Sequence, residues 1–276
     1  MLQLGTIEAG SRHDLRVGKS PDAPDESDVL DEKSGTYGYV HSYETSSRYD
    51  GPGLRTVLFV SGCLLRCTYC HNPDTWHLKD GTYISSKQVL DRLAGFTPAL
   101  RSLDGGLTIS GGEPMVQMAF TQEVLAGAKK LGLHTAIETS GFLGERASDA
   151  YLSLIDLVLL DIKSSIPETY KKVTSRDLAP TLRFARRLAD MGKPTWIRFT
   201  LVPGHTDDPD NVEGIATFVA PMKNVAWVEV QPFHQLGEFK WKAMGLPYVH
   251  EDTPTPTPDL IGRVIGQFRA AGCNVR

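Results

Sequence analysis

Short apolar runs alternate with amphipathic stretches from Gly35 to the end of the chain. Six runs are nearly continuous in apolar residues and predict buried strands at 55–61, 107–110, 134–138, 157–161, 195–202 and 226–231. The stretches between and after them predict helices at 86–94, 120–131, 147–154, 179–191, 210–220 and 258–271. Apolar strands that alternate with helices are typical of a parallel sheet covered by helices. Six such units are fewer than the eight of a closed barrel, so we expect an α/β fold with a partial (β/α)6 barrel.

The first 34 residues differ in composition from the rest. The stretch from Ser20 to Glu32 carries six acidic residues and no basic one, and Val29 and Leu30 are its only large apolar side chains. Such a segment buries too little apolar surface to offset the entropy of ordering it. We therefore predict a disordered acidic extension at 1–34 and one folded domain at 35–276. A docking arm for a partner is the alternative interpretation of the extension.

Composition narrows the class of protein further. The 276 residues carry a formal net charge of -4 and include four cysteines. This mild acidity does not provide the basic surface that a nucleic-acid backbone attracts, and no apolar run approaches the ~20 residues of a membrane span. The first residues lack the basic start and long apolar stretch of a secretory signal. We expect a soluble, monomeric, cytoplasmic protein without a nucleic-acid or membrane partner.

Three of the four cysteines, Cys63, Cys67 and Cys70, form a C-x3-C-x2-C motif directly after the first predicted strand. Thiolates on one loop can point to one centre, and they select zinc, copper(I) or iron–sulfur clusters. Four-iron clusters ordinarily use four cysteines, so three close ones leave one metal position open for a reactive ligand. The alternative is a structural zinc with Cys273 or a histidine as fourth ligand, although the sequence has no second paired C-x2–4-C motif of the kind typical of zinc sites.

Polar segments follow three successive predicted strands. They are Ser110-Gly111-Gly112-Glu113, Glu138-Thr139-Ser140-Gly141 and Asp161-Ile162-Lys163. In parallel α/β folds, ligands bind at the carboxyl ends of the strands. We therefore expect these segments to meet the cysteine motif at one mouth of the barrel. The structural alternatives are a tight turn at the glycine pair and a surface ion pair between the aspartate and the lysine.

The C-x3-C-x2-C motif, with the aromatic Tyr69 before its third cysteine, resembles that of the radical S-adenosylmethionine superfamily. Further segments narrow the resemblance to the glycyl-radical enzyme activating family, which includes the pyruvate formate-lyase activating enzymes. In chain order they are Asp50-Gly51-Pro52-Gly53, Cys70-His71-Asn72-Pro73-Asp74-Thr75-Trp76, Ser110-Gly111-Gly112-Glu113-Pro114, Asp161-Ile162-Lys163, Trp196-Ile197-Arg198, Val202-Pro203-Gly204 and the run 233–241. The similarity extends from about Gly35 to the C-terminus and implies the partial barrel of radical S-adenosylmethionine enzymes.

The resemblance implies a radical oxidoreductase. Cys63, Cys67 and Cys70 would hold a [4Fe-4S] cluster whose fourth iron binds S-adenosylmethionine. One electron from the cluster would cleave this cofactor, and the 5′-deoxyadenosyl radical would take a hydrogen atom from a glycine Cα. The implied partners are a glycyl-radical enzyme, first of all pyruvate formate-lyase, and a flavodoxin-type electron donor. The alternatives are a different glycyl-radical enzyme, a small-molecule substrate, or a non-catalytic iron–sulfur or zinc protein.

The resemblance also assigns further site residues. Those implied to contact S-adenosylmethionine are Tyr69, Cys70, His71, Gly112, Glu113, Asp161, Ile162, Lys163, Ser164, Ser165, Arg198 and His234. For Arg198 the alternative is an internal ion pair, and for the two histidines it is an ordinary structural role.

Two more sites are implied by the same resemblance. A monovalent cation would lie at Glu138, Thr139 and Asp161, but Glu138 stands where the family usually has aspartate, and this departure would shift or abolish the ion site. The loop Asp50-Gly51-Pro52-Gly53 would receive the glycine segment of the partner. Cys273 has no implied role, and a small buried thiol is the default for it.

Overall fold

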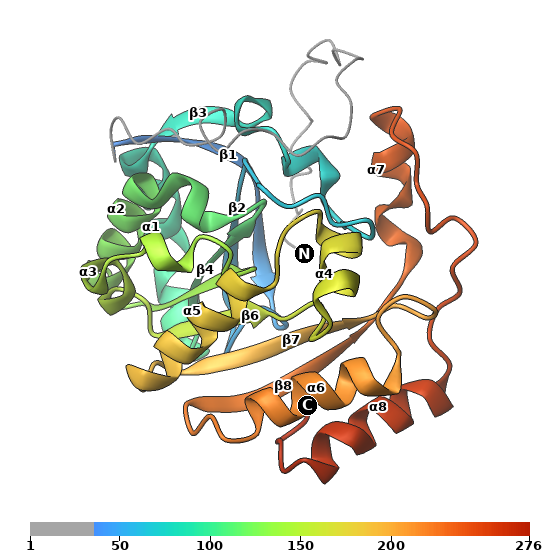
Figure 1. Ribbon diagram of the computed structural model, residues 1–276. Helices are drawn as coiled ribbons and strands as arrows, with labels where there is room; N and C mark the ends of the chain where they lie inside the picture. The colour runs from blue at the N-terminus through green and yellow to red at the C-terminus, as the bar shows by residue number, and fades with distance from the viewer. Residues whose placement is uncertain (1–35) are drawn as a thin grey trace.

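The computed structural model describes residues 36–276, and the predicted acidic extension at 1–34 lies outside them. The described residues form one eight-stranded sheet in the order β3-β1-β2-β4-β5-β6-β7-β8 (Figure 1). Strands β2, β4, β5, β6, β7 and β8 are parallel to one another. Because β3 and β8 end this order and do not pair with each other, the barrel is open. The predicted partial α/β barrel is confirmed.

The six parallel strands coincide with the six apolar runs of the sequence. They are β2 (Arg55–Val60), β4 (Gly106–Gly111), β5 (His134–Thr139), β6 (Leu157–Asp161), β7 (Thr195–Leu201) and β8 (Val225–Pro232). The register aligns Asp161 at the end of β6 with Arg198 of β7. Strand pairing alone therefore places two of the predicted site residues at the same height in the barrel.

Two antiparallel strands, β1 (Tyr37–Ser47) and β3 (Thr82–Ser85), extend the sheet beyond β2 and were not predicted. In β1, Val40 is the only large apolar side chain that is fully buried. The strand forms because its main chain pairs with β2 on one side and β3 on the other. A strand held mainly by main-chain hydrogen bonds leaves no run of apolar residues to detect in the sequence.

Eight α-helices and five short 3₁₀ turns lie within residues 36–276. The helices are α1 (Ser86–Ser102), α2 (Met118–Lys130), α3 (Asp149–Ser153), α4 (Pro167–Thr174), α5 (Ala179–Asp190), α6 (Pro209–Val219), α7 (Glu238–Ala243) and α8 (Pro258–Ala270). The 3₁₀ turns are η2 (Pro73–Thr75), η3 (Leu78–Asp80), η4 (Pro114–Gln117), η5 (Gly144–Arg146) and η6 (Gln235–Gly237). All six predicted helices are present, whereas α4 and α7 were not predicted.

Helix boundaries follow local sequence signals at most N-termini. Ser85 accepts a hydrogen bond from the Gln88 N–H and begins α1 with a reciprocal capping box. The Asp208 and Thr257 side chains cap α6 and α8, each followed by proline at the first helical position. The C-terminal end of α1 was predicted too early, at 94. Its buried stripe continues through Thr97 and Leu100, which carries the helix past Gly95 and Pro98.

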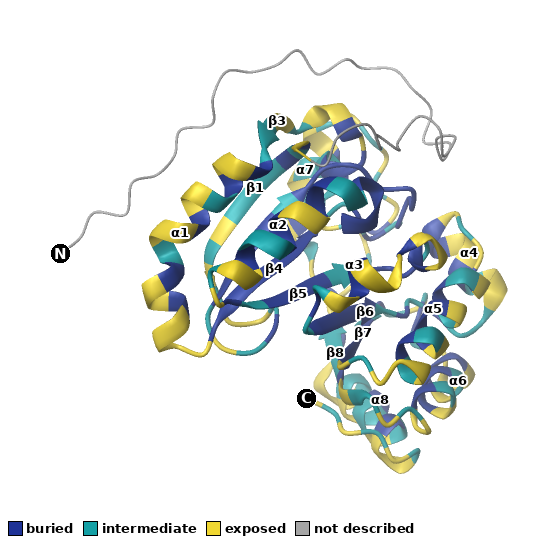
Figure 2. Ribbon diagram, turned by 90° about the vertical axis from the view of Figure 1, so that its left-hand side faces the viewer, coloured by how far each residue is buried: buried dark blue, intermediate teal, exposed yellow. Residues whose placement is uncertain are grey.

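Each long helix buries one face against the sheet and exposes the other (Figure 2). In α5 the buried residues Thr181, Phe184, Ala185 and Leu188 recur with helical spacing. Strands β2, β4, β5, β6 and β7 are almost fully buried, so the scaffold beneath the site is rigid. The last strand, β8, is more exposed. Among residues 36–276, none of the helices has the length and apolar character needed to cross a membrane.

Candidate active site

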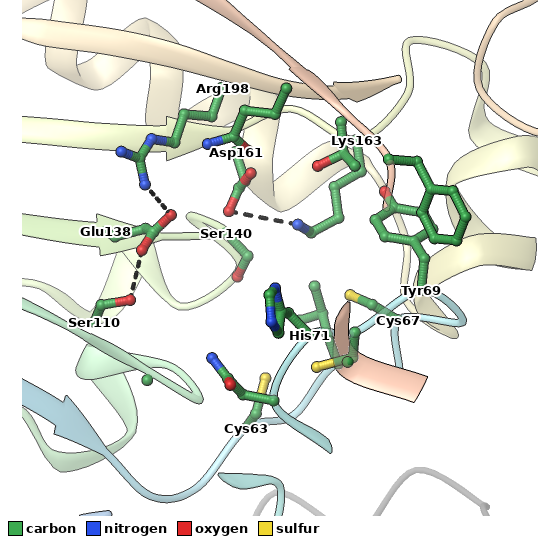
Figure 3. Close-up of a pocket in the computed structure, with 18 of the residues that line it drawn as sticks. Cys63, Cys67, Tyr69, His71, Ser110, Glu138, Ser140, Asp161, Lys163 and Arg198 are labelled. Atoms are coloured by element: carbon green, nitrogen blue, oxygen red, sulfur yellow. Dashed lines mark hydrogen bonds and ion pairs between the residues drawn. The ribbon is translucent and has the colours of Figure 1, made fainter. Parts of the chain in front are cut away.

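A cavity of about 880 Å³ lies where the carboxyl ends of the parallel strands meet the cysteine loop (Figure 3). Most of the residues predicted for the site line it, namely Asp50, Cys63, Cys67, Tyr69, Cys70, His71, Gly112, Glu138, Thr139, Asp161, Lys163, Arg198 and His234. These residues come from segments spread over most of the described chain. The structure therefore brings the cysteine motif, the strand ends and the late histidine to one mouth.

The cysteine loop follows β2 and is folded by its own main chain. The N–H groups of Gly62 and Cys63 donate to the carbonyls of Thr75 (2.7 Å) and Trp76 (3.0 Å), which closes the loop on the turn that follows it. The Arg66 guanidinium folds back and donates to the carbonyl of Cys63 at 2.7 Å. It also lies 4.8 Å from the centre of the Trp76 ring. The buried positive charge of Arg66 thus fixes the loop from within.

Two helices hold the cysteine loop from outside. On one side the N–H groups of Arg66 and Thr68 donate to the last carbonyls of α4, those of Thr174 (2.8 Å) and Val173 (2.9 Å). On the other side the Trp241 indole N–H of α7 donates to the Cys70 carbonyl at 2.9 Å. Neither helix was predicted from the sequence, yet both position the residues with the clearest chemistry.

The three thiols of the loop are free of disulfides, and those of Cys63 and Cys67 are buried. Burial raises the pKa of each, and raises that of Cys70 to about 12, while the neighbouring cysteines of the loop reinforce the effect at Cys63 and Cys70. Thiolates crowded in this way form readily only when a metal supplies positive charge. Three soft ligands on one loop beside a large cavity fit a [4Fe-4S] cluster with one iron open to a further ligand.

Asp161 and Lys163 form an ion pair on the opposite wall of the cavity, with Nζ 3.4 Å from Oδ2 (Figure 3). Burial alone would lower the pKa of Lys163, but the carboxylate of Asp161 outweighs it and holds the pKa well above its usual value. Burial raises the pKa of Asp161, and Lys163 opposes that rise. The ammonium also lies 5.9 Å from the centre of the Tyr69 ring. The pair is internal, so the alternative of an exposed surface ion pair is wrong.

Arg198 is the centre of a buried charge network. Its guanidinium donates to the carboxylates of Glu138, Asp50 (3.3 Å) and Glu229 (3.0 Å) and to the Tyr49 carbonyl (2.5 Å). Burial would lower the pKa of Arg198, but these carboxylates raise it. Burial likewise would raise the pKa of Glu138, whereas Arg198 and the Ser110 hydroxyl lower it. The internal ion pair considered for Arg198 is therefore present, and it lies inside the cavity.

The turn after β4 packs directly on the cysteine loop. Gly112 donates its N–H to the Val60 carbonyl at 2.8 Å, and a Cβ at this position would lie 2.4 Å from the Gly62 carbonyl oxygen. The next residue, Glu113, does not line the cavity. Its carboxylate accepts hydrogen bonds from Thr139 Oγ1 (2.7 Å) and from the N–H (3.0 Å) and hydroxyl (2.6 Å) of Ser140. It also accepts from the Met115 N–H at 3.2 Å, so the observed contacts of Glu113 are with its own turn and with the end of β5 and the turn that follows.

Several other predicted residues lie behind the cavity wall. Ser164 Oγ and the Ser165 N–H both donate to the side-chain oxygen of Asn211 on α6, at 2.7 and 2.8 Å. Ile162 is fully buried in the core. In the loop after β1, Gly51, Pro52 and Gly53 shape the turn, and only Asp50 of that motif reaches the cavity. Gly53 has a φ of 67°, a conformation suited to glycine.

His71 and His234 meet edge to face, with ring centres 5.0 Å apart, and both line the cavity. Burial lowers the pKa of His71, and the neighbouring His234 adds to the effect. The two imidazoles come from the cysteine loop and from the segment after β8. Their contact joins the first and last parts of the site.

The sequence reasoning missed some residues of the cavity wall. Among them are Tyr49, Glu229, Val230 and Arg276. The signal for Glu229 was present, because a strand alternates sides with a period of two and Glu229 and Gln231 share one face of β8. Nothing in the sequence indicated that Tyr49 or Arg276 would lie at the cavity.

Comparisons with known proteins agree with this geometry. Residues 49–176 match the family described as a 4Fe-4S single cluster domain. A pyruvate formate-lyase-activating enzyme of Listeria monocytogenes is 40% identical over 230 residues, which is 81% of this chain and 93% of that protein. A solved domain of the pyruvate-formate lyase-activating enzyme from Bacteroides vulgatus has a TM-score of 0.53 at 23% identity, over 62% of this chain and 98% of that one. A radical SAM methyltransferase from Sphaerobacter thermophilus has a TM-score of 0.58 at 15% identity, over 83% of this chain and 70% of that one.

The fold, the cysteine site and the curated relative together define a radical S-adenosylmethionine enzyme with a partial barrel and a [4Fe-4S] cluster. Sequence identity over most of both chains narrows the class. The chain belongs to the pyruvate formate-lyase-activating enzyme family.

Proposed function

We propose that this protein activates a glycyl-radical enzyme, with pyruvate formate-lyase as the partner. The observation that carries the proposal is the single cavity in which three free cysteines on one loop face a buried aspartate–lysine pair and the Asp50 loop. When bound, the [4Fe-4S] cluster and S-adenosylmethionine supply the one-electron cleavage and the 5′-deoxyadenosyl radical that takes a hydrogen atom from a glycine Cα. Everything else is positioning, charge and exclusion of water by this chain.

The roles of the chain's own residues follow from their places in the cavity. Cys63, Cys67 and Cys70 hold the cluster, and Arg66 keeps their loop in shape from within. The ammonium of Lys163 offers a donor and a positive charge to the carboxylate of S-adenosylmethionine, while Asp161 accepts from polar groups of the cofactor. Gly112 lets the wall come close to the cysteine loop, so the cofactor site stays narrow at that point.

Tyr69, His71 and His234 provide flat surfaces and ring nitrogens for the nucleoside part of the cofactor. Asp50, held by Arg198, faces the same cavity and receives the glycine segment of the partner. Glu113, Ile162, Ser164 and Ser165 are assigned a supporting role. Glu113 holds the turn after β5, Ser164 and Ser165 bind Asn211 of α6, and Ile162 packs in the core. Reduction by a flavodoxin-type donor and action as a monomer complete the proposal.

Anaerobic reconstitution tests it. The protein is loaded with iron and sulfide, mixed with S-adenosylmethionine and dithionite, and assayed for 5′-deoxyadenosine. Pyruvate formate-lyase is then added, and its glycyl radical is measured by electron paramagnetic resonance. A colourless, zinc-loaded protein that produces no 5′-deoxyadenosine would contradict the radical chemistry. 5′-Deoxyadenosine without a glycyl radical would contradict the choice of partner. Replacing dithionite with reduced flavodoxin tests the donor.

A further inference from the structure

The outer edge of β8 is open at Val230. β8 is the last strand of the sheet and pairs with β7 on its inner side. On its outer side it meets only the segment 274–276, where Val228 donates to the Asn274 carbonyl (2.8 Å) and accepts from the Arg276 N–H (3.0 Å). Main-chain groups alternate sides along a strand, so the N–H and C=O of Val230 point outward like those of Val228. Within residues 36–276 no backbone segment pairs with them.

This open edge belongs to the cavity. Val230 lines the cavity, yet its side chain packs against the hydrophobic core on the helix side of the sheet. What Val230 presents at the site is therefore its main chain. Glu229 and Gln231, its neighbours on the strand, line the cavity as well, and Glu229 is fixed there by Arg198. A sheet edge of this kind recruits an extended chain through main-chain hydrogen bonds.

The Asp50 loop lies across Arg198 from the open edge. One guanidinium contacts Glu229 Oε2 of β8 at 3.0 Å, Asp50 Oδ1 at 3.3 Å and the Tyr49 carbonyl at 2.5 Å. Arg198 therefore spaces the β8 edge and the Asp50 loop as two walls of one opening. The Tyr49 side chain is 80% exposed at this opening, which leaves it available to a partner.

We propose that an extended, glycine-bearing segment of the partner protein adds to the outer edge of β8 at Val230, with Asp50 and Tyr49 on its other side. The inference rests on the proposed function and specifies how the partner enters. The hydrogen atom to be removed is on a Cα, so the partner must present its main chain to the cavity. An extended segment paired at Val230 is held by its own main chain, which fixes the depth at which the glycine Cα lies.

Val230→Pro tests the pairing with a minimal change. Proline removes the outward N–H but no hydrogen bond to β7, and edge strands accept proline at such positions. Val230→Ala is the matched control, since it removes side-chain packing but keeps the N–H. We expect Val230→Pro to raise the KM for the partner about tenfold, as loss of one main-chain hydrogen bond does, with a smaller change in kcat. The rise in KM is measured relative to Val230→Ala, so that the loss of side-chain packing common to both variants cancels.

Hydrogen exchange on the wild-type holoenzyme gives a second measurement that does not depend on a variant folding. The Val230 amide should exchange more slowly when the partner is added, whereas the amide of exposed Phe239 should not change. Absence of protection at Val230, or an unchanged KM for Val230→Pro, overturns the inference. A third outcome would also overturn the inference. If light scattering shows that Val230→Pro has a lower mass than the wild type and the two proteins do not differ otherwise, the β8 edge joins two copies of this chain and not the partner. If the wild type forms no glycyl radical in any partner, the proposed function itself fails.

Discussion

Trp241 donates its indole N–H to the main-chain carbonyl of Cys70 at 2.9 Å, although 171 positions separate the two residues in sequence. The same indole meets Trp76 edge to face at 5.2 Å and packs with Cys63 and Cys67. A short helix late in the chain is thus part of the wall around the three thiols. This packing covers the cysteines on the side of α7 and Trp76.

Trp241→Phe should weaken the packing around the three thiols without leaving a large cavity. The ring still fills most of the space, but the Cys70 carbonyl loses its donor in a buried place, which costs about 1–2 kcal/mol of unfolding free energy. Urea denaturation and the rate of bleaching of the iron–sulfur absorption in air measure the effect. Phe239→Ala, on the exposed face of the same helix, is the control and should behave like the wild type.

We expect Cys63, Cys67 and Cys70 to be ligands of the cluster and Cys273 not to be one. Cys67→Ala is expected to abolish the brown colour, the iron content and 5′-deoxyadenosine formation, because two thiolates cannot hold a four-iron cluster. Cys273→Ser should keep all three, since that thiol does not line the cavity; it packs against the core and donates to the Ala216 carbonyl at 3.7 Å. Iron analysis and Mössbauer spectra of the two variants show whether each one still holds the four-iron cluster. Loss of the cluster in Cys273→Ser would contradict the assignment.

Arg198 should make a monovalent cation unnecessary at Glu138. The Glu138 carboxylate already accepts from Arg198 and, at 2.5 Å, from the Ser110 hydroxyl, while the Thr139 hydroxyl donates to Glu113. We expect the Kd for S-adenosylmethionine to be the same in potassium, sodium and tetramethylammonium salts. A clear loss of affinity in tetramethylammonium would restore the cation site predicted from the family pattern.

Arg198→Gln should make the protein sensitive to the monovalent cation. It leaves the carboxylates of Asp50, Glu138 and Glu229 without their shared counter-ion, which costs about 3 kcal/mol of stability or more. Potassium should then raise the melting temperature of the variant more than tetramethylammonium does. Arg183→Gln, which breaks an exposed pair with Glu145, serves as control and should show no such difference.

His250 should make stability fall below neutral pH. Its imidazole is fully buried between the hydroxyls of Thr68 (2.9 Å) and Thr253 (3.2 Å), and burial, assisted by His205, lowers its pKa to about 4. The unfolded chain takes up this proton near pH 6.5 and the folded protein does not. Stability is therefore complete above pH 6.5 and declines as the pH falls toward 4, by roughly 3 kcal/mol at most.

Denaturation curves at pH 7 and pH 5 measure this decline. In His250→Gln the amide does not titrate, so the difference between the two pH values should shrink. His77→Gln is the control and should keep the dependence of the wild type. An equal decline in wild type and His250→Gln would show that other groups are responsible.

The parallel strands were predictable because the apolar pattern that marks each of them lies within a short stretch of sequence. A strand buried on both faces must be apolar throughout, and Leu157 to Leu160 make β6 visible without any tertiary information. The helices that were missed are of the opposite kind. α7 is six residues long, and its Trp241 contact, rather than intrinsic propensity, holds it in place. β1 likewise depends on its neighbours on both sides.

Site residues were predictable where residue type and spacing determine the chemistry. They were not predictable where the role depends on the direction in which the side chain points. Three cysteines on one loop have few other uses, so their meeting at the cavity follows from spacing. Glu113 has the right residue type beside Gly112, but the turn aims its carboxylate at Ser140 and away from the cavity. For Glu229 the strand alternation indicates only a shared face with Gln231; its ion pair with Arg198 depends on the register between β7 and β8, which the sequence does not determine.

The support of the cysteine loop by α4 and α7 has a consequence for biosynthesis. The three thiols are synthesised together, but the carbonyl of Thr174 and the indole of Trp241 emerge from the ribosome later, Trp241 171 residues after Cys70. Until both have docked, the loop lacks the contacts that fix its shape and shield its sulfurs. Iron delivery must therefore wait until the chain has been synthesised at least as far as Trp241, and the maturation machinery meets a folded barrel instead of a nascent peptide.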